Sequence, residues 1–382
     1  KGALVKSVPM AMLKEFQRQI TGYEIKAFNG GAKFRNGDTL LAKITPCLEN
    51  GKTAFVDILD DGEVAFGSTE FIVLRAKNET NPEFLYYFAI SPDFRKRAIE
   101  CMEGTSGRQR VNENTLKTLE LPIPEPQTQQ SIAAVLSALD KKIALNKQIN
   151  ARLEEMAKTL YDYWFVQFDF PDANGKPYKS SGGEMVFDET LKREIPKGWE
   201  VKSLNQVADI VMGQSPDGAS YNLEQEGTIF FQGSTDFDWR FPNVRQYTTS
   251  PTRFAQKGDI LLSVRAPVGT LNIADTRCCI GRGLAAINSK VRANSYIFNV
   301  MQDFKKLFDM MNSVGTTFGS ITKDDLYSLQ LVYPPTELLM KFDKSVKSFD
   351  KEIKNRSRQN QELTQLRDWL LPMLMNGQVK VK

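Results

Sequence analysis

Two long stretches of the chain carry apolar residues at heptad spacing, and this pattern predicts two long α-helices. In the first, residues 128–164, one apolar row is flanked by further apolar positions: Ile132, Leu139, Leu153 and Leu160, with Leu136, Ile143, Ile149 and Met156 beside them. At about 1.5 Å per residue this helix is roughly 55 Å long. The second stretch follows a double proline at residues 334–335 and runs through Phe342, Phe349, Ile353, Leu363 and Leu370.

Polar residues interrupt both apolar rows at one level, Asn146 and Asn150 in the first helix and Arg356 and Asn360 in the second. Polar residues at such positions fix helix register and partner at some cost in stability. Because two narrow apolar stripes each need a partner, we expect the two helices to pack antiparallel as a coiled coil. The alternative is that each helix packs on its own domain. The expected spacer positions are Leu139, Ile143, Asn150, Leu153, Leu160, Phe349, Ile353, Asn360, Leu363 and Leu370.

The remaining sequence reads as short apolar runs separated by Gly, Asn, Asp and Pro, a pattern that predicts β-strands. Examples are residues 54–59, 70–76, 259–266 and 271–275. Short helical stretches rich in aromatic residues follow at 82–101 and 295–311. We therefore expect the α+β class, without a prediction of strand order.

The chain also repeats itself. GDTLLAKITP at residues 37–46 returns 221 positions later as GDILLSVRAP at 258–267, and TLKTLELPIPEP at 115–126 returns as DLYSLQLVYPP at 325–335. An offset of 210 relates the second pair, and it also relates Asp93-Phe94 to Asp303-Phe304, Asp140-Lys141 to Asp350-Lys351, and Asn150 to Asn360. A constant frame with a variable interior is typical of two related modules with different specificities.

These patterns divide the chain into a first globular module (1–122), a first long helix (123–168), a Gly/Ser/Pro-rich linker (169–194), a second module (195–333), and a second long helix with a tail (334–382). The second module opens with IPKGWEVKSLNQVADIVMGQSP at residues 195–216. The first module has no counterpart to this opening, because residue 1 aligns near Tyr221. We therefore expect that the first module has lost a leading segment.

Composition narrows the possible chemistry. The chain has 382 residues, 41% of them hydrophobic and 25% charged, as in ordinary soluble proteins. It has no apolar run of the ~20 residues that span a bilayer and no leader, so we expect a cytoplasmic protein without a membrane partner. It contains no histidine. This excludes Ser-His-Asp and Cys-His nucleophiles and imidazole metal ligands, and favours binding over catalysis.

Other catalytic features are also missing from the sequence. Four cysteines, Cys47, Cys101, Cys278 and Cys279, show no C-x-x-C spacing and are interpreted as free thiols. GRGLAAI at residues 281–287 lacks the helix-opening context of a nucleotide phosphate loop. The carboxylate pairs at 60–61 and 324–325 lie at turns or helix starts, where a structural role is favoured. We expect no catalytic residue and no metal site.

Several basic and amide residues indicate a double-stranded DNA partner. The net charge is +4 and the isoelectric point about 8.7, which permits such a partner. Arginine and glutamine make bidentate contacts to guanine and adenine edges. The candidate DNA-binding residues are Lys43, Arg108, Gln109 and Arg110 in the first module, and Gln214, Ser215, Arg240, Arg245 and Arg265 in the second. Each one alone is compatible with a solvated surface charge, but as a set they favour a duplex reader with two reading heads.

The chain as a whole resembles the DNA-specificity subunit of Type I restriction–modification enzymes. The resemblance rests on the repeated GD-x-LL segment, the L-x-x-L-x-(I/L)-P-x-P run before a long helix, the linker with IPKGWEVKSL, and WLLPMLMNGQV at residues 369–379. It covers essentially the whole chain. It implies that each module is a target recognition domain for one half of a split, asymmetric DNA sequence. The departure from the family pattern is the shortened front of the first module.

The resemblance also implies partners and cofactors. The two long helices would space the half-sites and dock two methylation subunits, and restriction subunits would join the assembly. S-adenosylmethionine, ATP and Mg would be held by those partners, and the target adenine would flip into a methylation subunit. This chain would hold no cofactor and catalyse nothing.

Two other functions compete with this interpretation. A self-contained nuclease or methyltransferase is disfavoured by the missing motifs and the absent histidine. A non-catalytic two-domain coiled-coil scaffold without DNA readout predicts no sequence preference in binding.

Overall fold

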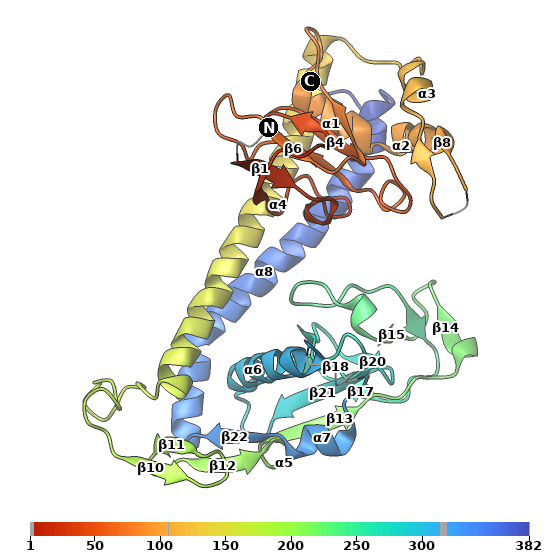
Figure 1. The fold of residues 1–382 in the computed structure, drawn as a ribbon. Helices are drawn as coiled ribbons and strands as arrows, with labels where there is room; N and C mark the ends of the chain where they lie inside the picture. Colours follow the sequence, from red (N-terminus) through yellow and green to blue (C-terminus); the bar gives the residue numbers. More distant parts are fainter. Residues whose placement is uncertain (1–3, 106, 314–318, 382) are drawn as a thin grey trace. The chain divides into compact units, whose positions relative to one another are not determined.

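A computed structural model describes residues 4–105, 107–313 and 319–381 (Figure 1). Residues 1–3 of the predicted first module and residue 382 of the predicted C-terminal tail lie outside the described residues. The chain divides into two compact units: unit 1 combines Lys1–Asn146 with Arg358–Lys382, and unit 2 is Lys147–Ser357. None of the helices within the described ranges has the length and apolar character that crossing a membrane requires.

Unit 1 contains two small β-sheets. The first has the strand order β2-β1-β6-β3, with β1 and β6 parallel and the other pairs antiparallel. The second has the order β5-β4-β7 and is antiparallel. The bounds are β1 (Leu4–Val8), β2 (Glu24–Ala27), β3 (Lys33–Phe34), β4 (Thr39–Ala42), β5 (Thr53–Phe55), β6 (Ala65–Gly67) and β7 (Phe71–Leu74). The core between them includes the buried side chains of Val8, Phe34 and Leu40.

Helix α1 (Pro82–Ile90) lies against β4 and β5. The helical stretch predicted for residues 82–101 consists of two helices, because Ser91 is extended and Pro92 has no backbone N–H. The Ser91 hydroxyl then accepts a hydrogen bond from Phe94 N at 3.4 Å and caps α2 (Pro92–Glu100). The hairpin β8 (Met102–Glu103) and β9 (Arg110–Val111) follows, and then α3 (Glu113–Lys117).

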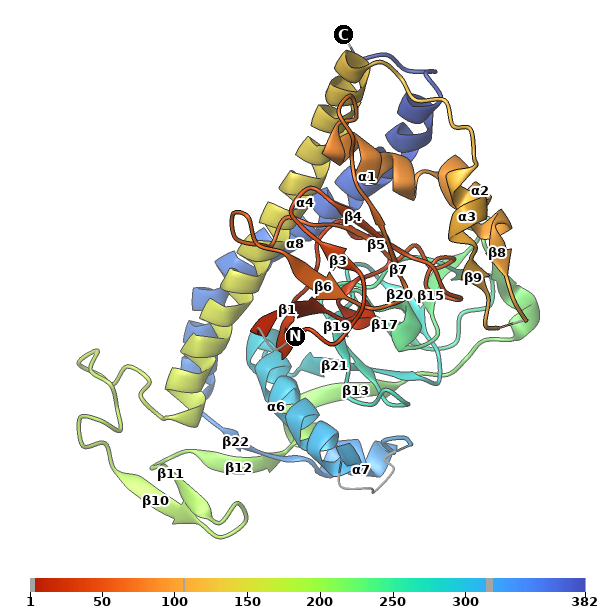
Figure 2. The same ribbon diagram turned by 45° about the horizontal axis from the view of Figure 1, so that its top comes forward.

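Unit 2 also contains two larger sheets, ordered β14-β16-β15-β20-β17 and β13-β21-β18-β19. Helix α6 (Asn294–Ser313) lies against β21 (Figures 1 and 2). The bounds are β13 (Ala208–Met212), β14 (Tyr221–Asn222), β15 (Thr228–Phe231), β16 (Tyr247–Thr248), β17 (Phe254–Ala255), β18 (Ile260–Ser263), β19 (Leu271–Ile273), β20 (Cys278–Ile280) and β21 (Leu284–Ser289).

Smaller elements frame unit 2. A hairpin forms from β10 (Met185–Asp188) and β11 (Arg193–Pro196) in the chain that precedes the module. The strands β12 (Glu200–Ser203) and β22 (Gln330–Tyr333) pair and bring the beginning and end of the module together. The short helices are α5 (Leu204–Val207) and α7 (Lys323–Ser328).

Both predicted long helices are present. Helix α4 (Pro126–Tyr161) has 36 residues and continues into a π-helical turn, Asp162–Val166, and α8 (Thr336–Met375) has 40. Each unit contains part of both helices. In unit 1, Leu136 of α4 and Leu371 of α8 belong to one apolar core, and in unit 2 Tyr161 packs against Phe342 at a ring-centroid distance of 6.3 Å.

The internal repeat is confirmed by matching backbone contacts. Gly37 N donates to Val56 O at 2.9 Å, and the repeat-equivalent Gly258 N donates to Ala274 O at 2.8 Å. Both glycines have positive φ, +88° and +94°, a conformation that L side chains rarely adopt. The bridge Ile44↔Arg110 in unit 1 corresponds to Arg265↔Ser320 in unit 2.

The Asp of each GD-x-LL segment has a structural role. The carboxylate of Asp38 accepts a hydrogen bond from Arg35 N at 2.8 Å, and that of Asp259 accepts one from Gln256 N at 2.6 Å. Both side chains are buried. These bonds close the turn before β4 and before β18 respectively, which explains why the Gly-Asp pair occurs in both modules.

The two modules differ at one sheet edge. In unit 2, β21 pairs with β18 on one side and with β13 on the other. In unit 1, the equivalent strand β7 pairs with β4, and no strand of the described residues pairs with its other edge.

Candidate nucleic-acid interface

In the second module, three loops meet where β13 ends. Gln214 N donates to Ile280 O at 3.0 Å, and Arg282 N donates to Ser215 Oγ at 3.3 Å. A Cβ atom at Gly213 would lie 2.1 Å from Gly281 O, so only glycine allows this approach of the two backbones. The predicted residues Gln214 and Ser215 therefore lie beside Arg282, whose side chain is exposed.

A further arginine joins this group. Arg253 is exposed, its carbonyl accepts a hydrogen bond from Ile280 N at 2.9 Å, and the neighbouring Thr252 hydroxyl donates to Gln214 O. We call Gln214, Ser215, Arg253 and Arg282 the loop cluster. Two guanidinium groups, an amide and a hydroxyl are the groups that contact phosphates and base edges in DNA complexes.

Sequence reasoning missed Arg253 and Arg282. The sequence does contain a signal for Arg282, the Gly-Arg-Gly triplet at residues 281–283, because glycines allow backbones to approach closely. A Cβ atom at Gly283 would lie 2.8 Å from Gln232 O, so this triplet also packs closely against the chain that follows β15. Both glycines of the triplet therefore allow the neighbouring loops to pack closely beside Arg282.

Arg245 lies on the loop after β15. Its side chain is 62% exposed, and its guanidinium lies 3.4 Å from the buried carboxylate of Asp236. It also donates to Thr235 O at 3.3 Å. The side chain is thus oriented by its own loop while its charge stays accessible. Arg265 is exposed as well.

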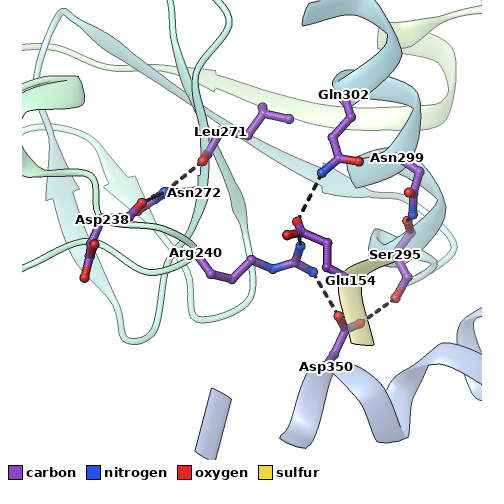
Figure 3. A network of polar contacts seen from close by, with 9 residues as sticks. All are labelled: Glu154, Asp238, Arg240, Leu271, Asn272, Ser295, Asn299, Gln302 and Asp350. Atoms are coloured by element: carbon purple, nitrogen blue, oxygen red, sulfur yellow. Dashed lines mark hydrogen bonds and ion pairs between the residues drawn. The ribbon is translucent and has the colours of Figure 1, made fainter. Parts of the chain in front are cut away.

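Arg240 departs from the expectation of an exposed DNA contact. It is 7% exposed, and its guanidinium forms ion pairs with Glu154 at 3.1 Å and Asp350 at 2.9 Å (Figure 3). The guanidinium also stacks over Phe298, 3.9 Å from the ring centroid. Its donors are directed at carboxylates on α4 and α8, so we leave Arg240 out of the proposed DNA-contact set.

In the first module, the predicted residues lie around the β8–β9 hairpin. Arg108 is exposed on its loop, and Gln109 O accepts a hydrogen bond from Thr45 N at 3.0 Å. Arg110 forms a bidentate ion pair with Glu70, with N–O distances of 2.9 to 3.1 Å. The Arg110 guanidinium lowers the pKa of the Glu70 carboxyl below its usual value.

Lys43 is less accessible than predicted. Its ammonium lies 2.9 Å from Glu113, and its side chain is 20% exposed. Both residues line a groove of about 810 Å³ along β7 and α3. The groove is otherwise mainly apolar and includes Phe71, Leu74 and Leu116. In the second module β13, which leads to Gln214, covers the corresponding edge of β21.

The expected helix-spacer positions divide into buried and half-buried sets. Ile143, Asn150 and Ile353 are buried, whereas the others are half-buried: Leu139, Leu153, Leu160, Phe349, Asn360, Leu363 and Leu370. The buried apolar side chains of α4 therefore come from both predicted rows: Ile132 from the main row, and Leu136 and Ile143 from the positions beside it. Met156, expected beside that row, is 54% exposed.

Polar side chains join α4 to α8 in each unit. In unit 1, Asn146 donates to Asn360 Oδ1 at 2.9 Å and to Gln359 Oε1 at 2.7 Å. In unit 2, Asn150 donates to Ser357 Oγ at 3.2 Å. Three of the four predicted polar interruptions, Asn146, Asn150 and Asn360, are therefore hydrogen-bonded between the helices, whereas Arg356 bonds Glu352 on its own helix.

A buried ion pair lies farther along the helices in unit 1. Arg367 of α8 donates to Asp140 of α4 at 2.9 Å, and the Tyr87 hydroxyl donates to the other Asp140 oxygen at 2.7 Å. The side chains of Arg367 and Asp140 are 8% and 4% exposed. The aspartates of the repeated Asp-Lys pair, Asp140 on α4 and Asp350 on α8, thus each bond an arginine.

Comparisons with known proteins agree on one family. Residues 7–155 and 196–365 match the family described as Type I restriction modification DNA specificity domain. The putative type I restriction enzyme MjaX specificity subunit of Methanocaldococcus jannaschii is 32% identical over 361 residues, which are 92% of this chain and 81% of that protein. The type I restriction enzyme HindI specificity subunit of Haemophilus influenzae is 26% identical and covers 93% of this chain and 90% of its own length.

A solved structure shares the fold. The S subunit of a Type-I restriction-modification system from M. genitalium superposes with a TM-score of 0.57 at 14% identity. The superposition covers 97% of this chain and 88% of that subunit.

Proposed function

This chain belongs to the family of Type I restriction–modification DNA specificity subunits, and we propose that each of its modules reads one half of a split, asymmetric DNA sequence. The observation that carries the proposal is the repeat. Two modules share a frame fixed by the GD-x-LL turn, whereas the segments between the conserved turns differ in length and in exposed side chains. Two modules that share a fold but differ in their loops would bind two different half-sites.

In the second module, the loop cluster and Arg245 would contact the DNA. Arginine and glutamine side chains recognise guanine and adenine edges, and serine and backbone N–H groups bind phosphates. In the first module, Arg108, Gln109 and Arg110 on the β8–β9 hairpin would have this role. Arg265 would add a phosphate contact in the second half.

The two long helices would set the distance between the half-sites as an antiparallel coiled coil. Two side-chain contacts within unit 1 support this: Asp140 bonds Arg367 and Asn146 bonds Asn360, so residue numbers rise along α4 as they fall along α8. A helix of 36 residues is roughly 54 Å long, longer than one turn of DNA at about 34–36 Å. The proposed domain boundaries are those predicted from the sequence: the first module (1–122), the first helix (123–168), the linker (169–194), the second module (195–333), and the second helix with the tail (334–382).

The chemistry would belong to partner subunits. In this proposal two methylation subunits bind the helices, and restriction subunits complete the enzyme. S-adenosylmethionine, ATP and Mg would be held by those partners, and the target adenine would enter a methylation subunit. Family membership supports this division of labour, because the matched family is described by DNA specificity.

A binding selection tests the proposal. The full chain, purified with its methylation subunit, is incubated with a randomised DNA duplex library at 50 and 200 mM salt. We expect enrichment of two short motifs at a fixed gap, with affinity falling steeply with salt because phosphate contacts release counterions. Enrichment of no sequence would favour the scaffold alternative. Methyl transfer by the purified chain alone would favour the self-contained enzyme.

A further inference from the structure

We infer that Arg240 is a positioning residue that orients the second recognition module on α4 and α8, and that it thereby limits which gap between half-sites the subunit accepts. The inference rests on the proposed function and goes beyond it, because it assigns gap selection to one side chain of a recognition module. Arg240 is one of the residues that the sequence predicts as DNA contacts.

The contacts of Arg240 join three parts of unit 2. One guanidinium nitrogen bonds Glu154 on α4, and the other bonds Asp350 on α8 (Figure 3). A planar guanidinium with two diverging donors can hold two carboxylates at once, which a lysine ammonium does less specifically. The two helices and the module are therefore connected through a single side chain.

The carboxylates are held in place independently of Arg240. Gln302 on α6 donates to Glu154 at 3.3 Å, and Ser295 at the start of α6 donates to Asp350 at 3.0 Å (Figure 3). Phe298, also on α6, lies under the guanidinium. The cavity left among these side chains is about 10 Å³, at the lower limit for one water molecule, so the charges are little screened.

The backbone around Arg240 is fixed to the module. Ile273 N on β19 donates to Arg240 O at 2.9 Å, and the buried Asn272 donates to Asp238 O at 2.8 Å. On the same loop, Asp236 orients the candidate DNA contact Arg245. A displacement at Arg240 would therefore move both a strand of the module and a DNA-facing side chain.

A second contact from α8 follows one turn later. Lys354 forms an ion pair with Asp275, just after β19, and its ammonium lies 5.9 Å from the ring centroid of Phe241. Asp350 thus contacts Arg240 itself, and Lys354 contacts the neighbouring Phe241 and the segment that follows β19. Because the contacts come from two successive turns of α8 and reach two segments of the module, they restrict rotation of the module about α8 as well as its distance from that helix.

The first module is attached differently. Its repeat-equivalent carboxylate, Asp140, is paired with Arg367 from α8, and the module contributes only the neutral hydroxyl of Tyr87. An ion pair also joins the first module to α4, where Lys141 Nζ lies 3.8 Å from Glu83 on α1, but these side chains are 70% and 29% exposed, so the connection is solvated. The second module therefore differs from the first in presenting a buried arginine to carboxylates of both helices.

The test uses the full chain in complex with its methylation subunit. Duplexes carry both half-sites, as identified in the selection above, with gaps varied one base pair at a time. We expect the unmodified complex to prefer one gap over its neighbours by about tenfold, because a fixed module forces DNA of another length to twist or bend. In Arg240→Met this preference should fall to about two- to threefold, with both half-sites still required.

Control variants separate positioning from folding. Arg152→Met/Glu155→Gln removes an exposed ion pair of α4 close to Glu154, with an N–O distance of 2.8 Å, and should leave the gap profile unchanged. If Arg240→Met does not fold, Arg240→Met/Glu154→Gln/Asp350→Asn is used in its place, because it leaves no unpaired buried charge. The same loss of gap preference is expected.

The outcomes are distinguishable. A broadened gap profile with unchanged half-sites supports the inference. An unchanged preference for one gap in the folded variant overturns it and leaves the proposed function intact. A complex of the unmodified chain that prefers no gap would contradict the proposed function itself.

Discussion

Asp140 and Asp350, which lie 210 positions apart at equivalent places in the repeat, each receive the guanidinium of an arginine that is 8% exposed. The arginines come from different sources. Arg367 belongs to the opposite helix, whereas Arg240 belongs to a recognition module. The repeat has therefore kept the carboxylate and changed its partner, so that one ion pair joins helix to helix and the other joins a module to both helices.

The Asp140–Arg367 pair gives a prediction about stability. Arg367→Met should lower the free energy of unfolding by about 3–5 kcal/mol, because it leaves the buried Asp140 carboxylate without its cation. Chemical unfolding followed by circular dichroism measures the change. Arg152→Met, which removes one member of an exposed pair, should have little effect. A loss below about 1 kcal/mol for Arg367→Met would mean that Tyr87 and solvent are sufficient to stabilise the Asp140 carboxylate without its arginine.

The asparagines at the helix junction predict a non-additive pair of substitutions. Asn146→Leu alone should destabilise by about 1–3 kcal/mol, because it leaves a polar group of Asn360 unpaired. Asn146→Leu/Asn360→Leu should be close to neutral or stabilising, since both polar groups are replaced together. A double-mutant cycle of unfolding free energies measures the coupling. Additive losses from the two single substitutions would show that the hydrogen bond does not couple them.

Arg282 should determine part of the second half-site. Arg282→Ala should reduce DNA affinity by about 1–3 kcal/mol, equivalent to about 5- to 150-fold, and relax one base position. Binding to duplexes substituted at each half-site position measures both effects. The matched control is Lys192→Ala on the β10–β11 hairpin, where the lysine pairs with Glu189 at 2.7 Å. Equal losses for the two variants on every duplex would show that Arg282 contributes only charge.

The Glu70–Arg110 pair predicts a pH dependence. Because Arg110 lowers the folded-state pKa of Glu70, the pair contributes stability above the usual carboxyl pKa, and this contribution is lost as pH falls through the lowered pKa. NMR titration of the Glu70 carboxyl should show the lowered pKa, and Arg110→Gln should raise it toward the ordinary value. A Glu70 pKa that is the same in both proteins would show that the ion pair does not form in solution.

Local sequence patterns were sufficient for much of the fold. Heptad spacing located both long helices to within a few residues, because helix formation depends on neighbours along the chain. The apolar run at residues 259–266 likewise contains β18. The repeat was visible in sequence because the GD-x-LL turn needs a glycine with positive φ and an Asp that bonds the backbone.

The candidate site was harder to predict, because it depends on contacts between distant segments. Arg240 stands among aromatic residues as an exposed DNA contact would, but its partners Glu154 and Asp350 are 86 and 110 positions away. Arg253 and Arg282 belong to different loops that meet only after β13, β15 and β20 are assembled. Local sequence patterns do not predict contacts between distant loops, although the glycines that permit these contacts can be seen in the sequence.

A map of methylated adenines tests the central claim most directly. The chain is co-expressed with its methylation subunit, and its DNA is compared with DNA from cells in which residues 1–119 are replaced by the first module of a relative. We predict a split motif with a fixed gap, of which the replacement changes one half and leaves the other half and the gap unchanged. A motif that changes in both halves, or methylation that does not depend on this chain, would contradict the account.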